Sequence, residues 1–81
     1  MKKTIYTVTR FDIEDGFYVE VSPITNNEGK EMYDFFLCKE NYGIKELMFG
    51  LYANDCQPNE WEDMISANVY DYIESFIENM E

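Results

Sequence analysis

The chain has 81 residues and a formal net charge of −11, because 17 acidic side chains outnumber 6 basic ones. This length allows one domain with a thin core, so we expect a single compact domain over residues 1–81. Apolar residues make up 46% of the chain and aromatic residues 17%, which favours a packed fold over disorder. The excess of negative charge repels nucleic acid and anionic membranes, and it attracts basic partners.

The two cysteines and the N-terminal sequence indicate a cytoplasmic protein. Cys38 and Cys56 form no metal-ligand spacing, and we expect free thiols in a reducing compartment, although their number also allows one disulfide. The opening "MKKTIYTVTR" lacks the apolar segment of a signal peptide. No run approaches the 18 apolar residues or so of a membrane span.

The first third of the chain predicts a β-hairpin. The segment 4–11, "TIYTVTRF", is rich in β-branched and aromatic residues, which favour strands. Asp15 and Gly16 then form a turn signal. In the segment 17–22, "FYVEVS", apolar and polar residues alternate as in a half-buried strand.

A third strand is predicted after a polar loop. Pro23 is expected to end the second strand or to mark a sheet edge. Gly29 in the loop is free to adopt a positive φ. The segment 32–39, "MYDFFLCK", carries apolar residues at both alternating positions, which is typical of a central strand or of one covered on both faces.

The residues that follow predict a first helix. The helix is expected to begin at Asn41 or at Tyr42-Gly43, and five apolar residues then recur at i, i+3, i+4, i+7 and i+8, a helical period. The sequence "AND" at 53–55 is expected to end this helix, and Gly50 inside it costs about 1 kcal/mol relative to alanine. The five residues of the stripe are Ile44, Leu47, Met48, Leu51 and Tyr52.

The last helix is the clearest element of the sequence. It begins either with Pro58 at its first position or with Asn59 and Glu62 as a capping box. Its apolar residues lie within roughly 120° of arc and are expected to pack on the sheet. They are Trp61, Ile65, Val69, Tyr72, Ile73, Phe76 and Met80. The predicted fold is therefore α+β, a three-stranded antiparallel sheet followed by two α-helices packed on one face, in the order β-β-β-α-α.

Opposite this apolar stripe, the last helix carries a row of carboxylates. Residues 46–81 hold nine acids and no base, whereas a solvated face normally mixes both signs. One interpretation is compositional drift on an exposed surface. The other is imitation of the phosphate row of a nucleic acid, which would place these side chains against Lys and Arg of a partner. The row consists of Glu60, Asp63, Asp71, Glu74, Glu78 and Glu81.

The sequence predicts neither catalysis nor a metal or cofactor site. It contains no histidine, and no Gly-rich phosphate loop or zinc spacing. The segment "DIEDG" at 12–16 fails to match a calcium loop, which needs acids at its first, third and fifth positions, glycine at the sixth and a bidentate Glu at the twelfth. We therefore expect a non-enzymatic protein, and a charged hairpin turn at 12–16.

A second surface is also a candidate for partner binding. Tyr6, Tyr18 and Tyr33 lie on predicted strands, and exposed tyrosines beside carboxylates suit a protein interface. The alternative function is accordingly a small regulatory interaction domain that binds a basic protein through its aromatic sheet face.

In type, the chain resembles small acidic proteins of phages and mobile elements, especially anti-CRISPR proteins and DNA mimics. The resemblance is carried by its length, by the stretch "EWEDMISANVYDYIESFIENME" at 60–81 and by the compact sheet-plus-helix plan. Because the resemblance includes no shared motif, it assigns no functional residue to this chain. It implies a stoichiometric inhibitor that binds a basic nucleic-acid-binding protein, such as a CRISPR effector or a nuclease, and blocks its nucleic-acid site. If the chain is phage-encoded, its compartment is the cytoplasm of the host cell.

Overall fold

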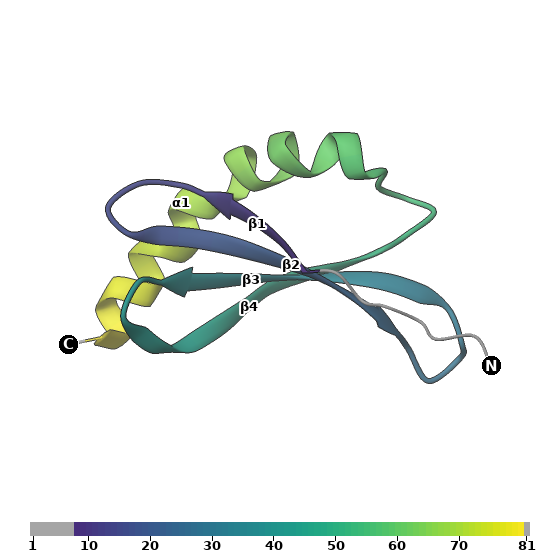
Figure 1. Cartoon of the computed structure of the whole chain (residues 1–81), viewed down its shortest axis with the longest axis horizontal. Coiled ribbons are helices and arrows are strands. Elements are labelled where there is room, and N and C mark those ends of the chain that lie inside the picture. Colours follow the sequence, from purple (N-terminus) through teal and green to yellow (C-terminus); the bar gives the residue numbers. More distant parts are fainter. Residues whose placement is uncertain (1–7, 81) are drawn as a thin grey trace.

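A computed structural model describes residues 8–80 as a four-stranded antiparallel sheet with one long helix on one of its faces (Figure 1). The strand order is β1-β2-β3-β4, so each strand pairs with its neighbour in the sequence. The elements are β1 (Thr9–Asp12), β2 (Phe17–Thr25), β3 (Glu31–Lys39), β4 (Tyr42–Tyr52), the 3-10 turn η1 (Pro58–Glu60) and α1 (Trp61–Met80).

The predicted first hairpin is confirmed. β1 and β2 pair antiparallel with Phe11 opposite Val19. Asp15 and Gly16 both have positive φ, 54° and 82°, as a tight hairpin turn requires. Of the strand predicted over 4–11, residues 4–7 lie outside the described part of the chain.

The second hairpin joins β2 to β3, and β3 is a central strand as predicted. β2 continues through Pro23, which pairs with Tyr33, so the prediction that Pro23 ends the strand is wrong. Proline is tolerated at a sheet edge, and among the described residues the β1 ladder extends only to Val21. The predicted loop closes around Asn26, whose side-chain oxygen accepts hydrogen bonds from the amides of Glu28 and Lys30, both at 2.9 Å.

The predicted helix after Asn41 is wrong, and with it the three-strand, two-helix fold. These residues form β4, the longest strand, which pairs with β3 along its length. The turn between them places Asn41 at φ 61°, a conformation that Asn tolerates better than most residues. As a helix this segment would hold two glycines, Gly43 and Gly50, each costing about 1 kcal/mol. As a strand it supplies a hydrogen-bonding partner for the edge of β3.

A β-bulge explains why β4 resembles a helix in sequence. Phe35 lies opposite Phe49, but the next residue, Phe36, lies opposite Leu47, so Met48 is an extra residue in the ladder. The extra residue interrupts the alternation and turns Met48 into the core, where it is 6% exposed. Leu47 beside it is 53% exposed. The apolar stripe predicted for one helix face is thus divided between both faces of the sheet.

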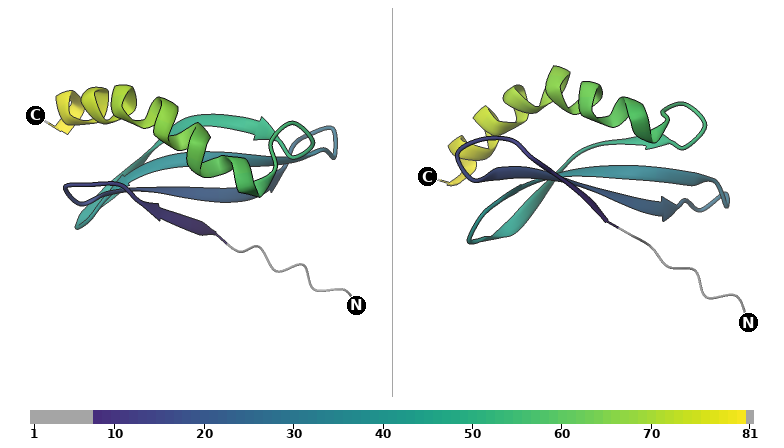
Figure 2. Two further views of the ribbon diagram at one scale, coloured as in Figure 1. Left: turned by 90° about the horizontal axis from the view of Figure 1, so that it is seen from above. Right: turned by 45° about the horizontal axis from the view of Figure 1, so that its top comes forward.

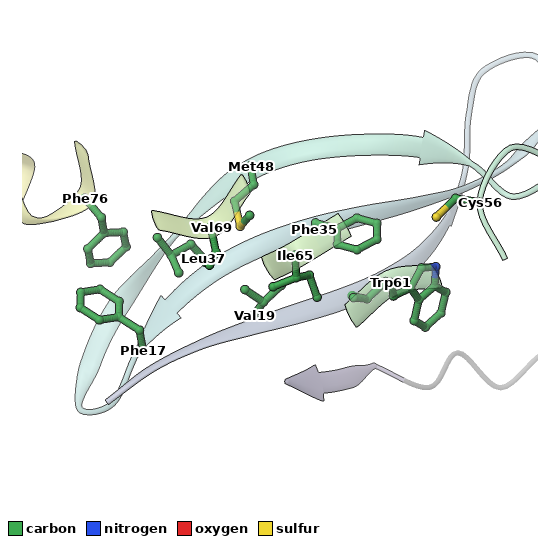
Figure 3. Close-up of a cluster of buried hydrophobic side chains, with 11 residues drawn as sticks. Phe17, Val19, Phe35, Leu37, Met48, Cys56, Trp61, Ile65, Val69 and Phe76 are labelled. Atoms are coloured by element: carbon green, nitrogen blue, oxygen red, sulfur yellow. The ribbon is translucent and has the colours of Figure 1, made fainter. Parts of the chain in front are cut away.

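The core lies between α1 and the sheet face that it covers, here called the inner face (Figure 3). At the start of the helix, the ring centroid of Trp61 lies 4.7 Å from that of Tyr33. Near its end, Phe76 makes an edge contact with Phe17 at 5.6 Å. The buried cluster comprises Phe17, Val19, Val21, Phe35, Leu37, Met48, Cys56, Trp61, Ile65, Val69 and Phe76.

The last helix is confirmed, and its apolar stripe packs on the sheet as predicted except at Met80, which is 39% exposed near the end of the helix. Pro58 lies in the first turn of η1, which leads into α1 at Trp61, and no side chain caps this start. Ile65 and Val69 are each 1% exposed against the sheet. The view from above shows α1 running obliquely across the strands (Figure 2). One helix therefore provides all the helical cover that the described chain gives its sheet.

Burial along α1 predicts unequal effects for two isoleucines. Replacing Ile65 by alanine should lower the free energy of unfolding by about 2–5 kcal/mol, because it leaves a cavity in the core. Ile77 is 44% exposed, so Ile77→Ala should change it by no more than about 0.5 kcal/mol. Urea denaturation followed by circular dichroism measures both, and equal losses would contradict this packing.

Candidate functional site

The predicted carboxylate row lies on the solvent side of the helix. The described acids of the row are Glu60 in η1 and Asp63, Asp71, Glu74 and Glu78 in α1, and all five are exposed. From Glu60 to Glu78 the row is about 27 Å long at 1.5 Å per residue. Glu81 lies outside the described residues.

The helical segments η1 and α1 contain no basic residue. The chain has no Lys or Arg after Lys45. Within residues 8–80, none of the four ion pairs includes a carboxylate of η1 or α1. The carboxylates on the helix are therefore not neutralised by the described part of the fold.

The four bases of residues 8–80 lie instead on the strands and the turns between them, and each contacts an aromatic ring. The guanidinium carbon of Arg10 lies 3.8 Å from the ring centroid of Tyr18, the shortest of these contacts. Such cation–π contacts are worth about 0.5–1 kcal/mol when exposed. The other three pairs are Lys30 with Tyr52 at 5.7 Å, Lys39 with Phe17 at 4.5 Å, and Lys45 with Phe36 at 5.0 Å.

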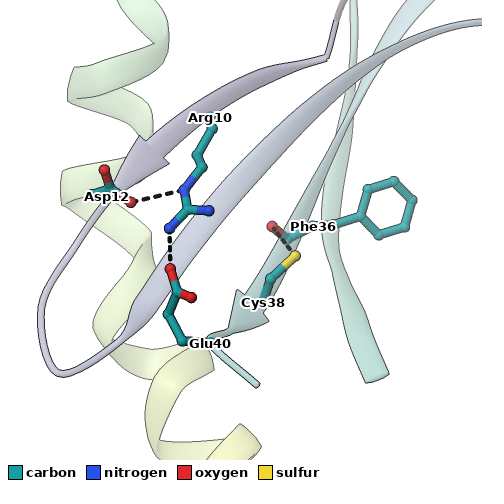
Figure 4. Close-up of polar contacts among 5 residues, drawn as sticks. All are labelled: Arg10, Asp12, Phe36, Cys38 and Glu40. Atoms are coloured by element: carbon teal, nitrogen blue, oxygen red, sulfur yellow. Dashed lines mark hydrogen bonds and ion pairs between the residues drawn. The ribbon is translucent and has the colours of Figure 1, made fainter. Parts of the chain in front are cut away.

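Arg10 is also the centre of a small ion-pair network (Figure 4). Its guanidinium donates hydrogen bonds to Glu40 and to Asp12, the latter at 2.8 Å. These bonds raise the pKa of Arg10 above its usual value, with Glu40 as the main cause. Arg10 links the start of the sheet to the β3–β4 turn, and its charge is satisfied within the fold.

Helix electrostatics separates the acids of α1 into two groups. Glu62 and Asp63 lie in the first turn, where a carboxylate interacts favourably with the helix dipole. Glu78 lies near the end, where the dipole favours a base and the last turn has none. Glu74 and Glu78 are four residues apart, which adds repulsion of a few tenths of a kcal/mol. The second half of the row is thus unfavourable for helix stability.

Two exposed apolar residues beside this row were not predicted. Tyr70 is 57% exposed and Ile77 is 44% exposed, and both lie on the flank between the carboxylate row and the buried stripe. They are seven residues apart, so they share a flank with Glu74 between them. Their positions outside the apolar stripe are the sequence signal that would have revealed them.

The sheet face opposite α1, here called the far face, is the second candidate surface. Tyr18 lies on it beneath Arg10, whereas Tyr33 packs on Trp61 in the core, and Tyr6 is outside the described residues. Among residues 8–80, no helix covers this face (Figure 2). Its side chains are Arg10 and Asp12 from β1, Tyr18, Glu20, Ser22 and Ile24 from β2, Met32, Asp34, Phe36 and Cys38 from β3, and Lys45, Leu47 and Tyr52 from β4.

Both cysteines are buried free thiols, in line with the sequence prediction. Burial raises the pKa of Cys38, and the negative charge of Glu20 raises it further. Burial likewise raises the pKa of Cys56, with a smaller effect from Glu60. A raised thiol pKa lowers the thiolate fraction at neutral pH, which makes these groups poor nucleophiles.

The described residues offer no grouping of three potential metal ligands among His, Cys, Asp and Glu. Over the same part of the chain, no helix combines the length and the apolar character that crossing a membrane demands. No protein-family model, curated protein or solved structure matches the chain.

The charge at the end of α1 gives a testable prediction. Glu78→Lys should raise the free energy of unfolding by about 0.3–1 kcal/mol at low ionic strength, because a base replaces an acid at the negative end of the helix dipole. Glu62→Lys makes the same change in net charge in the first turn and should lower it. Urea denaturation in low salt compares them, and a gain from both variants would show that net charge alone matters.

The buried thiols give a second prediction. At pH 7.5 the native chain should react far more slowly with an aromatic disulfide reagent than the chain unfolded in guanidinium.

The raised pKa of Cys38 means that the folded state holds this proton more tightly than the unfolded state. The contribution of Cys38 to the free energy of unfolding is therefore complete below about pH 8.5, the usual thiol pKa. It is lost as the pH rises through the pKa of this thiol in the folded state. Cys38→Ala should weaken this decline, and an unchanged decline would contradict the assignment.

Proposed function

We propose that this protein is a non-enzymatic inhibitor that binds a basic nucleic-acid-binding protein through the outer face of α1 and blocks its nucleic-acid site. The observation that carries the proposal is a solvent-exposed helix surface with acids at five described positions and no base. A partner groove lined with Lys and Arg would be complementary to it.

The unfavourable placement of these charges supports a role in binding rather than in folding. Glu74 and Glu78 repel each other, and Glu78 opposes the helix dipole. A cationic groove would offset both effects at once. Acids at the rim of such an interface would mainly speed association, while the few that lose their water would slow dissociation.

The exposed Tyr70 gives this surface a contact that charge alone does not provide. Tyrosine is enriched among the residues that dominate binding energy at protein interfaces. Grooves that hold single-stranded nucleic acid pair basic residues with aromatic platforms on which bases stack. Tyr70 beside Asp71 and Glu74 places a flat ring next to negative charge, as a nucleic acid places a base next to a phosphate.

The alternative surface, the aromatic sheet face, suits a basic partner less well. It holds Arg10 and Lys45, two of the four bases in the described residues, each placed over a ring of that face. Its aromatic side chains are therefore partly covered by bases that are already paired with acids, so this face offers Lys and Arg less attraction than α1 does. We assign a basic partner to α1 for this reason.

A displacement experiment tests the proposal. Lysate proteins bound to immobilised single-stranded or double-stranded nucleic acid at about 50 mM salt are eluted with the purified chain. The chain should release a basic protein, and should then compete with labelled nucleic acid for that purified protein in fluorescence anisotropy. The competition should weaken steeply as salt rises, because exposed charges are screened.

Two variants of equal net charge provide the control. Changing Asp71, Glu74 and Glu78 to Lys should abolish displacement. Changing Glu14, Glu28 and Glu31 to Lys should leave it within a few-fold, since these exposed acids belong to the sheet side. Equal losses of displacement in both variants would show that net charge, and not the position of the acids, controls binding. Failure of the unaltered chain to displace any protein would exclude the proposed function.

A further inference from the structure

The far face of the sheet has apolar side chains that the described chain leaves open. Leu47 is 53% exposed and Tyr52 is 43% exposed, while Tyr18 and Phe36 are half-buried. Phe36 lies opposite both Glu20 on β2 and Leu47 on β4, so it stands near the middle of the face. Exposed apolar patches bordered by polar groups are typical of interaction surfaces.

This face is also nearly neutral, although the whole chain carries −11. The side chains of this face include two bases, Arg10 and Lys45, against three acids, Asp12, Glu20 and Asp34, which gives −1 of the total of −11. The remaining −10 lies elsewhere on the chain. Lys45 and Glu20 already form an ion pair at 3.5 Å beside Phe36.

Charge decides which partner suits such a face. A basic protein meets little net charge on this face, because Arg10 and Lys45 are paired with acids, and finds a more complementary surface on α1. Nucleic acid is repelled by the whole molecule. A second copy of this chain presents an equally apolar and nearly neutral face. Two stacked sheets lie roughly 10 Å apart, and each α1 adds a further layer of roughly 10 Å on the outside. The two carboxylate rows would then lie well beyond the screening length of about 8 Å at physiological salt.

We propose that two copies of the chain associate through their far faces into a symmetric dimer, with Phe36 and Leu47 at its centre. About a two-fold axis the same patch serves both copies, so Lys45 of each can approach Glu20 of the other. The arrangement buries the apolar side chains of both sheets and leaves both α1 surfaces free for a partner. It rests on the far face alone and does not depend on the proposed function of α1.

Sedimentation equilibrium of the isolated chain tests this proposal. Over roughly 1–500 µM, the mass should rise from 9.7 kDa towards twice that value. Raising the salt from about 0.05 to 0.5 M should strengthen self-association, because salt screens the repulsion between two chains of −11. This is the opposite of the salt effect expected for a basic partner on α1, so the two kinds of association can be told apart.

Two aspartate variants give the matched comparison. Leu47→Asp should weaken dimerisation at least tenfold, because it places a charge at the centre of the interface. Ile77→Asp makes the same charge change at a similarly exposed apolar residue of α1 and should leave dimerisation unchanged. Tyr52→Asp is a second far-face variant should Leu47→Asp fail to fold, which circular dichroism would reveal.

Two outcomes would overturn the proposal. One is a single species of 9.7 kDa at every concentration and both salt levels, which would leave the far face to a different partner. The other is a dimer that Ile77→Asp disrupts while Leu47→Asp does not, which would place the contact between helices.

Discussion

The packing of one helix on one sheet face determines the rest of this structure. The apolar stripe of α1 is the only helical cover that residues 8–80 provide for the inner face, and the buried cluster extends from Trp61 to Phe76. A helix seated in this way has one orientation, because rotating it would expose Ile65 and Val69 to water. That orientation fixes which side chains point outwards, and so it is the burial of apolar residues that arranges the carboxylates in a row.

Charge in this molecule is segregated by layer. The helix layer holds acids alone, while the four described bases lie in the sheet layer and are held by rings and carboxylates of that layer. The bases are thus occupied in local contacts that stabilise strands and turns. The acids of the helix have no comparable partner within residues 8–80, and the net field of the protein is directed outwards from α1.

The sequence predicted well the parts whose pattern is local. The hairpin turn at Asp15 and Gly16, the central position of β3 and the extent of α1 follow from turn chemistry and periodicity. β4 could not be predicted in this way, because one extra residue at Met48 interrupts the strand alternation and produces a pattern like a helical stripe. A bulge depends on pairing with β3, which is a long-range interaction that no local pattern records.

The candidate site was predictable to a similar degree. Once α1 is known, helical geometry places Asp63, Asp71, Glu74 and Glu78 on its outer face, as the structure has them. What the sequence did not reveal is the context of that face. The helical period places Tyr70 outside the apolar stripe, but the degree of its exposure depends on how the helix packs on the sheet. Leu47 and Tyr52 lie on the far face because the first predicted helix is in fact the strand β4.

The position of Trp61 gives the protein a built-in optical probe. It is the only tryptophan of the chain. It lies where η1 meets α1, and its ring packs against those of Tyr33 and Phe35. Its indole N–H is buried and has no hydrogen-bond partner among residues 8–80. Its fluorescence in the native state should therefore be blue-shifted, and any event that lifts the helix from the sheet would appear as a shift of this single emission band to the red.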